Sequence, residues 1–369
     1  MEAHDDGGRS AMRAIAVAAI ALAGFLFSFT PVAERLDAAL LDIEWRALRN
    51  FDTRPAPDDI VIVGIDEATV SAIPEPPGMW HLPLGRALAR LAAAKPRAIG
   101  LEFPLPERSF DVVKPGLDRA LFDGLAAAVE NGPFVAVLNI DARTRSAKTI
   151  HTPYLALLGE SRLGLGLTAR DADGVTRRFS LLVPTEDGGF PTLEGRMCRA
   201  LKRDCNDGLI HFALGRPFAY VPLKNLLTMD EELARRLFRD RIVLIGEAQP
   251  YVGRLEVPMN LAAWESEARS SPGIVVHAQT LRTALAALAP QQATRPLVLI
   301  LLSLAALVYL VRDARMTAVT ALLAALAALV VAVAALRGGV AVPVSPILAT
   351  LLVAVAARAL PGLGRRRSS

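Results

Sequence analysis

Long apolar segments near both ends of the chain constrain its fold more than any other feature. From them we predict four transmembrane helices, over residues 14–30, 296–311, 316–336 and 340–360. A hydrocarbon core about 30 Å thick needs roughly 20 helical residues. The second segment is slightly short, but Arg295 and Arg312 can extend their side chains to the two interfaces. Pro343 and Pro346 are expected to shorten or kink the fourth helix.

The composition agrees with this division of the chain. Of its 369 residues, 53% are hydrophobic and 21% charged, and its mean hydropathy is +0.37. These values are too apolar for an ordinary soluble protein. Residues 31–294, between the apolar ends, are numerous enough for one domain with a full hydrophobic core.

The placement of arginine predicts the orientation. Arginines lie before the first apolar segment, between the second and third, and after the fourth: Arg9, Arg13, Arg312, Arg315, Arg365, Arg366 and Arg367. Because arginine-rich flanks stay in the cytosol, residues 1–13 and 361–369 are predicted to be cytosolic tails, and residues 31–294 to lie outside. The first segment could instead be a cleaved signal peptide, although Pro31 makes the best site, at Ala33, a poor one.

The net charge of +4 and the pI near 9.3 do not predict a nucleic-acid partner. The basic residues are spread along the chain, and several flank the apolar segments. Positive-inside topology and lipid headgroups account for them, so the expected partner is the lipid bilayer.

The outside segment has the pattern of an α/β domain with a mostly parallel sheet. Continuous apolar runs, typical of strands buried on both faces, occur at residues 60–66, 98–103, 134–140 and 241–247. Helical patterns separate them, as in right-handed crossover units. Residues 164–169 and 175–184 flank Arg170–Gly174 and are expected to form a hairpin around this turn.

Acidic residues follow several of these strands. They are Asp66, Glu67, Glu102, Asp141 and Glu247, at the sheet edge where ligands of parallel sheets bind. Converging carboxylates need a positive partner, and Arg86, or a bound cation, amine or calcium ion, can supply it. The structural alternatives are that Asp66 caps a helix, that Arg86 pairs with Asp66, and that Glu102 turns to solvent.

The last helix of the outside domain, over Pro272–Leu288, connects it to the second apolar segment. It carries His277 among apolar residues. This histidine is either a packed, hydrogen-bonded residue or a group whose charge changes with the external pH.

Cys198 and Cys205 both lie in the outside segment, where a disulfide can form. The alternative is two independent thiols. The spacing and the scattered histidines give only weak evidence for zinc, and whether any metal binds stays open.

No catalytic motif is present: the sequence has no GxSxG, HExxH, P-loop or dinucleotide-binding glycine pattern. We therefore expect no enzymatic activity and no cofactor.

Several segments together resemble the CHASE type 2 (CHASE2) domain, a sensory extracellular domain of membrane proteins. The matching positions are Asp66, Pro83, Arg86, Gly100, Asp173, Gly174, Arg178, Gly246, Pro258, Pro272, Gly273 and His277. The resemblance covers residues 35–290 and implies a multi-pass protein of the bacterial inner membrane, with its sensory domain on the periplasmic side. The sequence departs from the family at Glu102 and near Gly253, where the family often has Asp.

Family members commonly continue into a cyclase, kinase or phosphatase domain, whereas this sequence ends in a short basic tail. We therefore expect a sensor of a small ligand or ion that signals to a separate membrane protein or within a homo-oligomer. Two alternatives are a structural or interaction subunit of an envelope complex, and an enzyme acting at the acidic strand ends.

Overall fold

The computed structural model describes residues 3–51, 53–56, 59–141, 146–185, 188–266, 269–311 and 313–365. Arg312, Arg366 and Arg367, which entered the topology prediction, lie outside the described residues. The chain divides into two compact units. One comprises residues 52–289, and the other joins residues 1–51 to residues 290–369.

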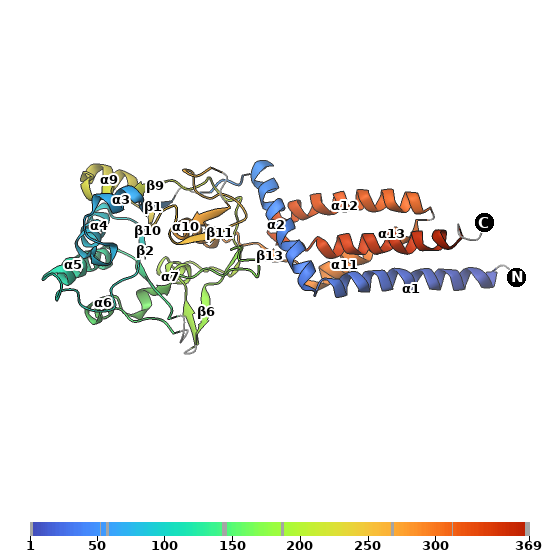
Figure 1. Ribbon diagram of the computed structural model, residues 1–369, viewed down its shortest axis with the longest axis horizontal. Helices are drawn as coiled ribbons and strands as arrows, with labels where there is room; N and C mark the ends of the chain where they lie inside the picture. Colours follow the sequence, from blue (N-terminus) through green and yellow to red (C-terminus); the bar gives the residue numbers. More distant parts are fainter. Residues whose placement is uncertain are drawn as a thin grey trace. The chain divides into compact units, whose positions relative to one another are not determined.

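The first unit is built on a six-stranded parallel sheet, which confirms the α/β part of the predicted fold class. Its strand order is β4-β3-β2-β10-β1-β9. The strands are β1 (Ile60–Ile65), β2 (Ala98–Glu102), β3 (Phe134–Leu138), β4 (Leu163–Leu165), β9 (Tyr220–Pro222) and β10 (Ile242–Glu247). Strand β10 lies between β1 and β2, pairing Ile60 with Ile242 and Gly246 with Glu102 (Figure 1).

Helices cover both faces of this sheet, which explains why its strands are continuous apolar runs. One face shares a core with α4 (His81–Ala94), α5 (Leu117–Asn131), α6 (Thr152–Leu158), α8 (Leu223–Thr228) and α9 (Glu231–Phe238). The opposite face packs against α7 (Leu193–Ala200) and α10 (Gly273–Leu285). Every residue of α10 from Gly273 to Ala284 is buried.

Helices α4 and α5 cross closely because each has a glycine at the contact. A Cβ on Gly85 would overlap the carbonyl of Ala120, and one on Gly124 would overlap the backbone of Gly85. This crossing fixes the position of the first turn of α4, which carries His81.

The smaller elements of this unit occur in the chain between the strands and helices just given. They are α3 (Glu67–Ala72), η1 (Pro77–Met79), η2 (Glu160–Arg162), β5 (Arg178–Phe179), β6 (Leu182–Thr185), β7 (Gly188–Pro191), β8 (Gly208–Leu209), β11 (Arg254–Glu256) and β12 (Ser270–Pro272). Strand β5 pairs with β8, β6 with β7, and β11 with β12, all antiparallel.

The predicted hairpin around Arg170–Gly174 is wrong in its pairing. The tight turn exists, with Gly174 at φ +84° and Gly174 N–H donating to the Asp171 carbonyl. The flanking segments do not pair with each other, because the buried β4 completes the parallel sheet beside β3, and β5 pairs with β8. Cys198 and Cys205 form a disulfide with a Cα–Cα distance of 6.3 Å, as the sequence favoured.

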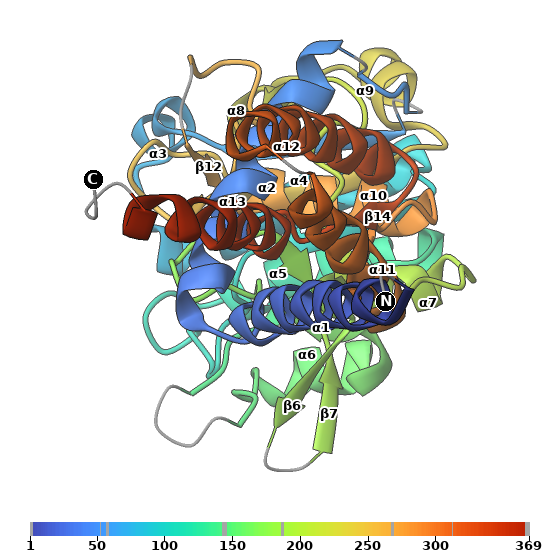
Figure 2. The ribbon, with the colours of Figure 1, turned by 90° about the vertical axis from the view of Figure 1, so that its right-hand side faces the viewer.

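The second unit is helical. It contains α1 (Ala3–Phe27), α2 (Pro31–Phe51), α11 (Arg295–Ala306), η3 (Leu307–Leu310), α12 (Ala314–Arg337) and α13 (Ser345–Arg365), with the short strands β13 (Gln291–Gln292) and β14 (Val340–Ala341). Helix α13 packs against α1, α11 and α12 (Figure 2). Helix α2 packs on α12 and α13, and Ser345 N–H donates to Asp37 Oδ1 at 2.7 Å. Helix α2, which follows the first apolar helix, therefore belongs to this unit rather than to the sheet domain that it precedes in the chain.

Among the described residues, two helices, not the four predicted, are long and apolar enough to cross a membrane by themselves. They are Ser10–Phe27 within α1, and α12. The other two predicted spans correspond to the shorter apolar helices Arg295–Leu310 and Ser345–Ala359. The helix before η3 is short because it tightens into a 3-10 turn. Helix α13 starts later than predicted, at Ser345, because residues 340–341 form the strand β14.

Candidate functional site

The acidic residues predicted at the strand ends do lie along the carboxyl edge of the sheet. Glu102 ends β2 and Glu247 ends the neighbouring β10, while Asp66 directly follows β1. Asp141 lies three residues beyond β3, on the other side of β2. The strand order therefore brings Glu102 and Glu247 onto adjacent strands, at the edge where parallel sheets bind ligands.

Asp66 has a structural role. Its Oδ1 accepts the Thr69 N–H at 2.7 Å and caps α3, and its Oδ2 accepts the Tyr220 hydroxyl at 3.1 Å. Glu67 is exposed in the first turn of the same helix. Arg86 is also exposed, and within the described part of the chain it has no ion pair. The alternative in which Arg86 pairs with Asp66 is thus wrong for the described residues, in which Asp66 instead binds the Thr69 N–H and the Tyr220 hydroxyl.

Asp141 belongs to the surface loop after β3. Its N–H donates to the Ser146 carbonyl at 3.0 Å. The pKa of the exposed Lys148 amine is raised chiefly by its bond to Glu107, and Asp141 adds a smaller effect. This acid therefore contributes to local surface charge pairing.

Glu102, Glu194 and His277 form a charge centre in which Glu194 and His277 are buried and Glu102 is half-buried. His277 Nδ1 lies 2.6 Å from Glu194 Oε1, and these side chains are only 3% and 4% exposed. Glu102 Oε2 is buried and has no hydrogen-bond partner among the described residues. Gly246 makes room for this carboxyl, because a Cβ there would overlap Glu102 Oε2.

Burial and charge act in opposite directions on these groups. Burial lowers the pKa of His277, but the carboxylates of Glu194 and Glu102 outweigh it and raise this pKa to about 9. For Glu102, burial raises the pKa to about 7, and Glu247 and Glu194 add to that rise while His277 opposes it. Burial also raises the pKa of Glu247. At neutral pH the centre thus holds an imidazolium–carboxylate pair beside a carboxyl near its titration point.

Glu194 is the member of this centre that the sequence did not reveal. It lies in the first turn of α7, after the cap Thr192, where a glutamate usually faces solvent. The one available signal was its position among apolar neighbours that are buried together with it. Among the described residues no His, Cys, Asp and Glu side chains are grouped in a way that could hold a metal ion, so the predicted calcium alternative gains no support.

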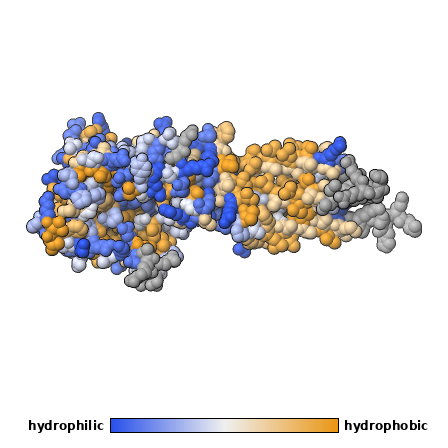
Figure 3. All heavy atoms as spheres, in the orientation of Figure 1, coloured by the Kyte–Doolittle hydropathy of each residue, from blue (hydrophilic) through white to orange (hydrophobic). Residues whose placement is uncertain are grey.

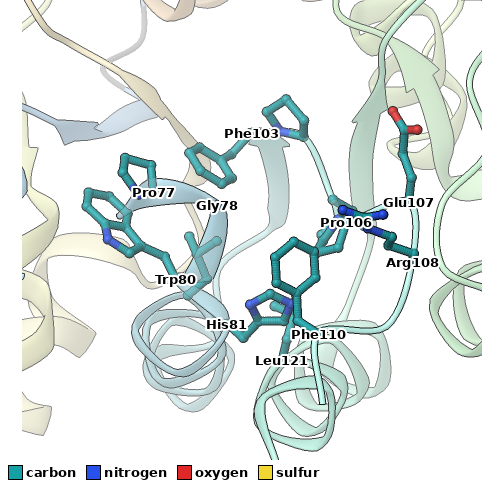
Figure 4. A pocket seen from close by; sticks show the side chains of 13 residues that line it. Pro77, Gly78, Trp80, His81, Phe103, Pro106, Glu107, Arg108, Phe110 and Leu121 are labelled. Atoms are coloured by element: carbon teal, nitrogen blue, oxygen red, sulfur yellow. The ribbon is translucent and has the colours of Figure 1, made fainter. Parts of the chain in front are cut away.

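A pocket of about 400 Å³ opens at the same edge of the sheet, on the face that α4 and α5 cover (Figure 4). Its walls are mostly apolar and come from η1, the start of α4 and the loop after β2. They consist of Pro77, Gly78, Trp80, His81, Leu84, Phe103, Pro104, Leu105, Pro106, Glu107, Arg108, Phe110 and Leu121. Its size lies within the range of ordinary small-molecule sites.

Proline and aromatic residues shape this pocket. Pro77 starts the 3-10 turn that delivers Trp80 and His81 to the beginning of α4. Trp80 donates its indole N–H to the Glu75 carbonyl at 2.7 Å, and its ring is nearly parallel to that of Phe103, with centroids 6.3 Å apart. The sequence analysis missed this site, although prolines and aromatic residues cluster in both contributing segments.

His81 is the buried polar side chain of the pocket wall. It is 1% exposed, and neither ring nitrogen has a hydrogen-bond partner among the described residues. Burial lowers its pKa, although the nearby Asp118 carboxylate opposes this. Asp118 lies 3.6 Å from His81 Nε2 and accepts hydrogen bonds from the Ser109 hydroxyl and the Phe110 N–H. A neutral imidazole, able both to donate and to accept, is therefore held in the pocket wall.

The pocket and the charge centre meet at consecutive residues of one strand end. Phe103 belongs to the core shared with α4 and α5, as Leu101 does. Side chains alternate along a strand, so Glu102 faces the opposite side, where Gly100 packs against Leu193 and Met197 of α7. Phe103 in the pocket wall and Glu102 beside His277 are thus consecutive residues. A movement of the loop at Phe103 therefore occurs next to Glu102.

The fold and site define a class of protein: an α/β domain with a pocket at the ligand-binding edge of its sheet, followed in the chain by apolar helices. More particularly, the chain belongs to the CHASE2 domain family of extracellular sensory domains, whose family model matches residues 15–311. The match begins in α1 and ends just after η3, so it includes the sheet domain with the charge centre and the pocket. No curated protein and no solved structure shows significant similarity to the chain.

Proposed function

We propose that this protein is a membrane-anchored sensor of the bacterial inner membrane that binds a small ligand outside the cytoplasm and passes the signal to a separate protein. In this proposal it has no catalytic activity of its own. Membership in the CHASE2 family supports sensing. The observation that carries ligand binding is the mostly apolar pocket at the carboxyl edge of the sheet, with the buried imidazole of His81 in its wall.

The membrane part of the proposal has all four apolar helices spanning. The shorter α11 and α13 pack alongside α1. The surface over these helices is predominantly apolar (Figure 3), and the large exposed side chains on it include Leu22, Leu299, Leu322, Leu326 and Leu352. A soluble protein rarely exposes so extended an apolar surface, whereas lipid accommodates it.

The proposed signal route uses α10. This helix carries His277 and is followed in the chain by Pro290 and then by α11. A ligand shifts a conformational equilibrium only by its different affinities for two states. A ligand in the pocket restrains the Phe103 loop and with it the neighbouring Glu102. Glu102 then stabilises one position of α10 at His277.

Binding is tested on the full chain in lipid nanodiscs by thermal unfolding, with organic acids, amines, nucleotides and divalent ions. A ligand at a hundred times its dissociation constant stabilises the folded state by about 2.7 kcal/mol. The matched control is Gly78→Trp, because a Cβ at Gly78 meets no atom within 4 Å and the indole would occupy the pocket. We expect the shift in wild type and its loss in the variant.

Location is tested by labelling intact cells with a membrane-impermeant maleimide after Val112→Cys, since Val112 is 89% exposed and the native cysteines are bonded to each other. Labelling without lysis is expected. If the Val112→Cys variant reacts only in broken cells, the sensory domain is intracellular and the proposal fails.

A further inference from the structure

The pocket beside His81 has chemical features that select among ligands. Its lining includes the aromatic residues Trp80, Phe103 and Phe110, and the ring of Phe110 lies 5.0 Å from that of His81. Burying an apolar body against such rings is favourable at about 25 cal/mol per Å². The ligand therefore needs a compact apolar or aromatic part.

The charge at the rim is positive. Arg108 is exposed, and no ion pair joins it to a carboxylate in the part of the chain that the structure describes. The neighbouring acid, Glu107, is bonded to Lys148 at 2.9 Å. In Figure 4 the Arg108 side chain extends back toward the pocket, whereas the Glu107 carboxylate points away from it. A guanidinium with its donors unused binds carboxylates through charge-assisted hydrogen bonds.

The negative charge behind His81 restricts the ligand further. Asp118 lies behind His81 and does not line the pocket, but its carboxylate is only 3.6 Å from the ring. Ser109 and Phe110 donate hydrogen bonds to it, and they hold its pKa below the ordinary value although burial opposes this. An anionic group beside His81 would meet this negative charge. The charged end of a ligand therefore belongs at Arg108, with a neutral or apolar part at His81.

We propose that the pocket binds a small organic monocarboxylate with an apolar or aromatic body. The body lies against Trp80, Phe103 and Phe110, and the carboxylate pairs with Arg108. This inference rests on the proposed ligand-sensing function and names the class of ligand. A cationic ligand is disfavoured because its charge would meet Arg108.

The test is calorimetric titration of the full chain in nanodiscs of neutral lipid. The probe is phenylacetate, compared with phenylacetamide, phenethylamine and acetate, which respectively lack the charge, reverse it and lack the ring. We expect saturable binding of one phenylacetate per chain, at least tenfold tighter than any of the other three. Tryptophan fluorescence supplies a second signal, to which Trp80 contributes together with Trp45 and Trp264.

The diagnostic variant is Arg108→Gln, and its matched control is Arg86→Gln, another exposed arginine that lies outside the pocket. Arg108→Gln should weaken phenylacetate binding at least tenfold and leave phenylacetamide unchanged, whereas Arg86→Gln should match wild type. Arg108→Lys, which keeps the charge, should retain part of the preference. Unchanged thermal unfolding of each variant shows that folding is intact.

Two results overturn this inference while leaving ligand sensing in place. One is that phenylacetate does not bind but a compound without a carboxylate stabilises wild type and not Gly78→Trp. The other is that phenylacetate binds equally well to the Arg108→Gln and Arg86→Gln variants. If no compound of any class binds, both this inference and the ligand-sensing proposal fail.

Discussion

At the scale of single residues, Glu102 is the group whose charge state depends most directly on its surroundings. Its pKa is raised to about 7, above the ordinary value of 4.5, primarily by burial. The charged groups around it come from three elements: Glu194 on α7, His277 on α10 and Glu247 on β10. The folded state therefore holds this proton more tightly than the unfolded state does.

Glu102→Gln should flatten the pH dependence of stability between about pH 4.5 and 7. A carboxyl with a raised folded-state pKa loses stability as pH rises through this window, because only the unfolded state ionises freely. The loss in wild type is on the order of 3 kcal/mol. Chemical denaturation of the full chain in nanodiscs at pH 4.5, 6 and 7.5 measures it.

The matched control is Glu67→Gln, an exposed acid near the same sheet edge. It should keep the wild-type slope. Both variants should also lose stability between about pH 6.5 and 9, because the raised pKa of His277 means that its pairing with Glu194 is lost as the imidazolium deprotonates. A Glu102→Gln variant with the full wild-type slope below pH 7 would show that another group titrates there.

Single residues also differ in how well their roles can be predicted from the sequence. The capping role of Asp66 was foreseeable, because an aspartate before a helix accepts a local N–H. The His277–Glu194 contact was not, since the two residues are 83 positions apart and meet only when α7 and α10 pack on the same face. Local chemistry is readable from the sequence, and long-range pairing depends on the topology.

At the scale of elements, the disulfide joins the last turns of α7 to the loop that follows it. Cys198 lies within α7, and Cys205 lies seven residues later. A closed loop of this length restricts the unfolded chain and stabilises the fold by about 2.5 kcal/mol. Because α7 supplies Glu194, this bridge also supports the charge centre.

The double substitution Cys198→Ala with Cys205→Ala should lower the unfolding temperature by about 5–10 °C. Thermal unfolding in nanodiscs measures it, with and without a reductant. Reduced wild type should behave like the variant, and the reductant should leave the variant unchanged. Equal unfolding temperatures for oxidised and reduced wild type would contradict the stabilising role.

Elements were predictable where burial imposes a simple pattern. The strands β1, β2, β3 and β10 are apolar runs, because helices cover both faces of the sheet. The short strands β5 and β8 were not paired correctly, since two-residue strands have no periodicity to read. The start of α13 was misplaced for a related reason: residues 340–341 are apolar yet form β14, which pairs with β13.

At the scale of the whole molecule, the number of spans decides which loops face which side. If all four apolar helices cross the membrane, the loop before α12 is cytosolic and the loop after it lies outside. If only α1 and α12 cross, these two loops exchange sides. The C-terminal tail is cytosolic in both arrangements, so it cannot distinguish them.

Ala314→Cys and Gly338→Cys, made separately, test this with a membrane-impermeant maleimide on intact cells. We expect Gly338→Cys to be labelled and Ala314→Cys to be protected, because the exposed apolar side chains of α11 and α13 are stabilised by lipid. Val112→Cys serves as the outside control. Labelling of Ala314→Cys with protection of Gly338→Cys would instead show that only α1 and α12 cross the membrane.

The amino-acid sequence by itself determined the long buried strands of this protein and the edge of the sheet where acidic residues gather. Apolar runs indicate buried parallel strands, and the carboxyl ends of parallel strands necessarily meet at one edge. Only the tertiary structure decided what lies at that edge. Inserting β10 between β1 and β2 brings Glu247 beside Glu102. The α4–α5 crossing and the loop after β2 enclose His81, because contacts between distant segments depend on packing that no local pattern encodes.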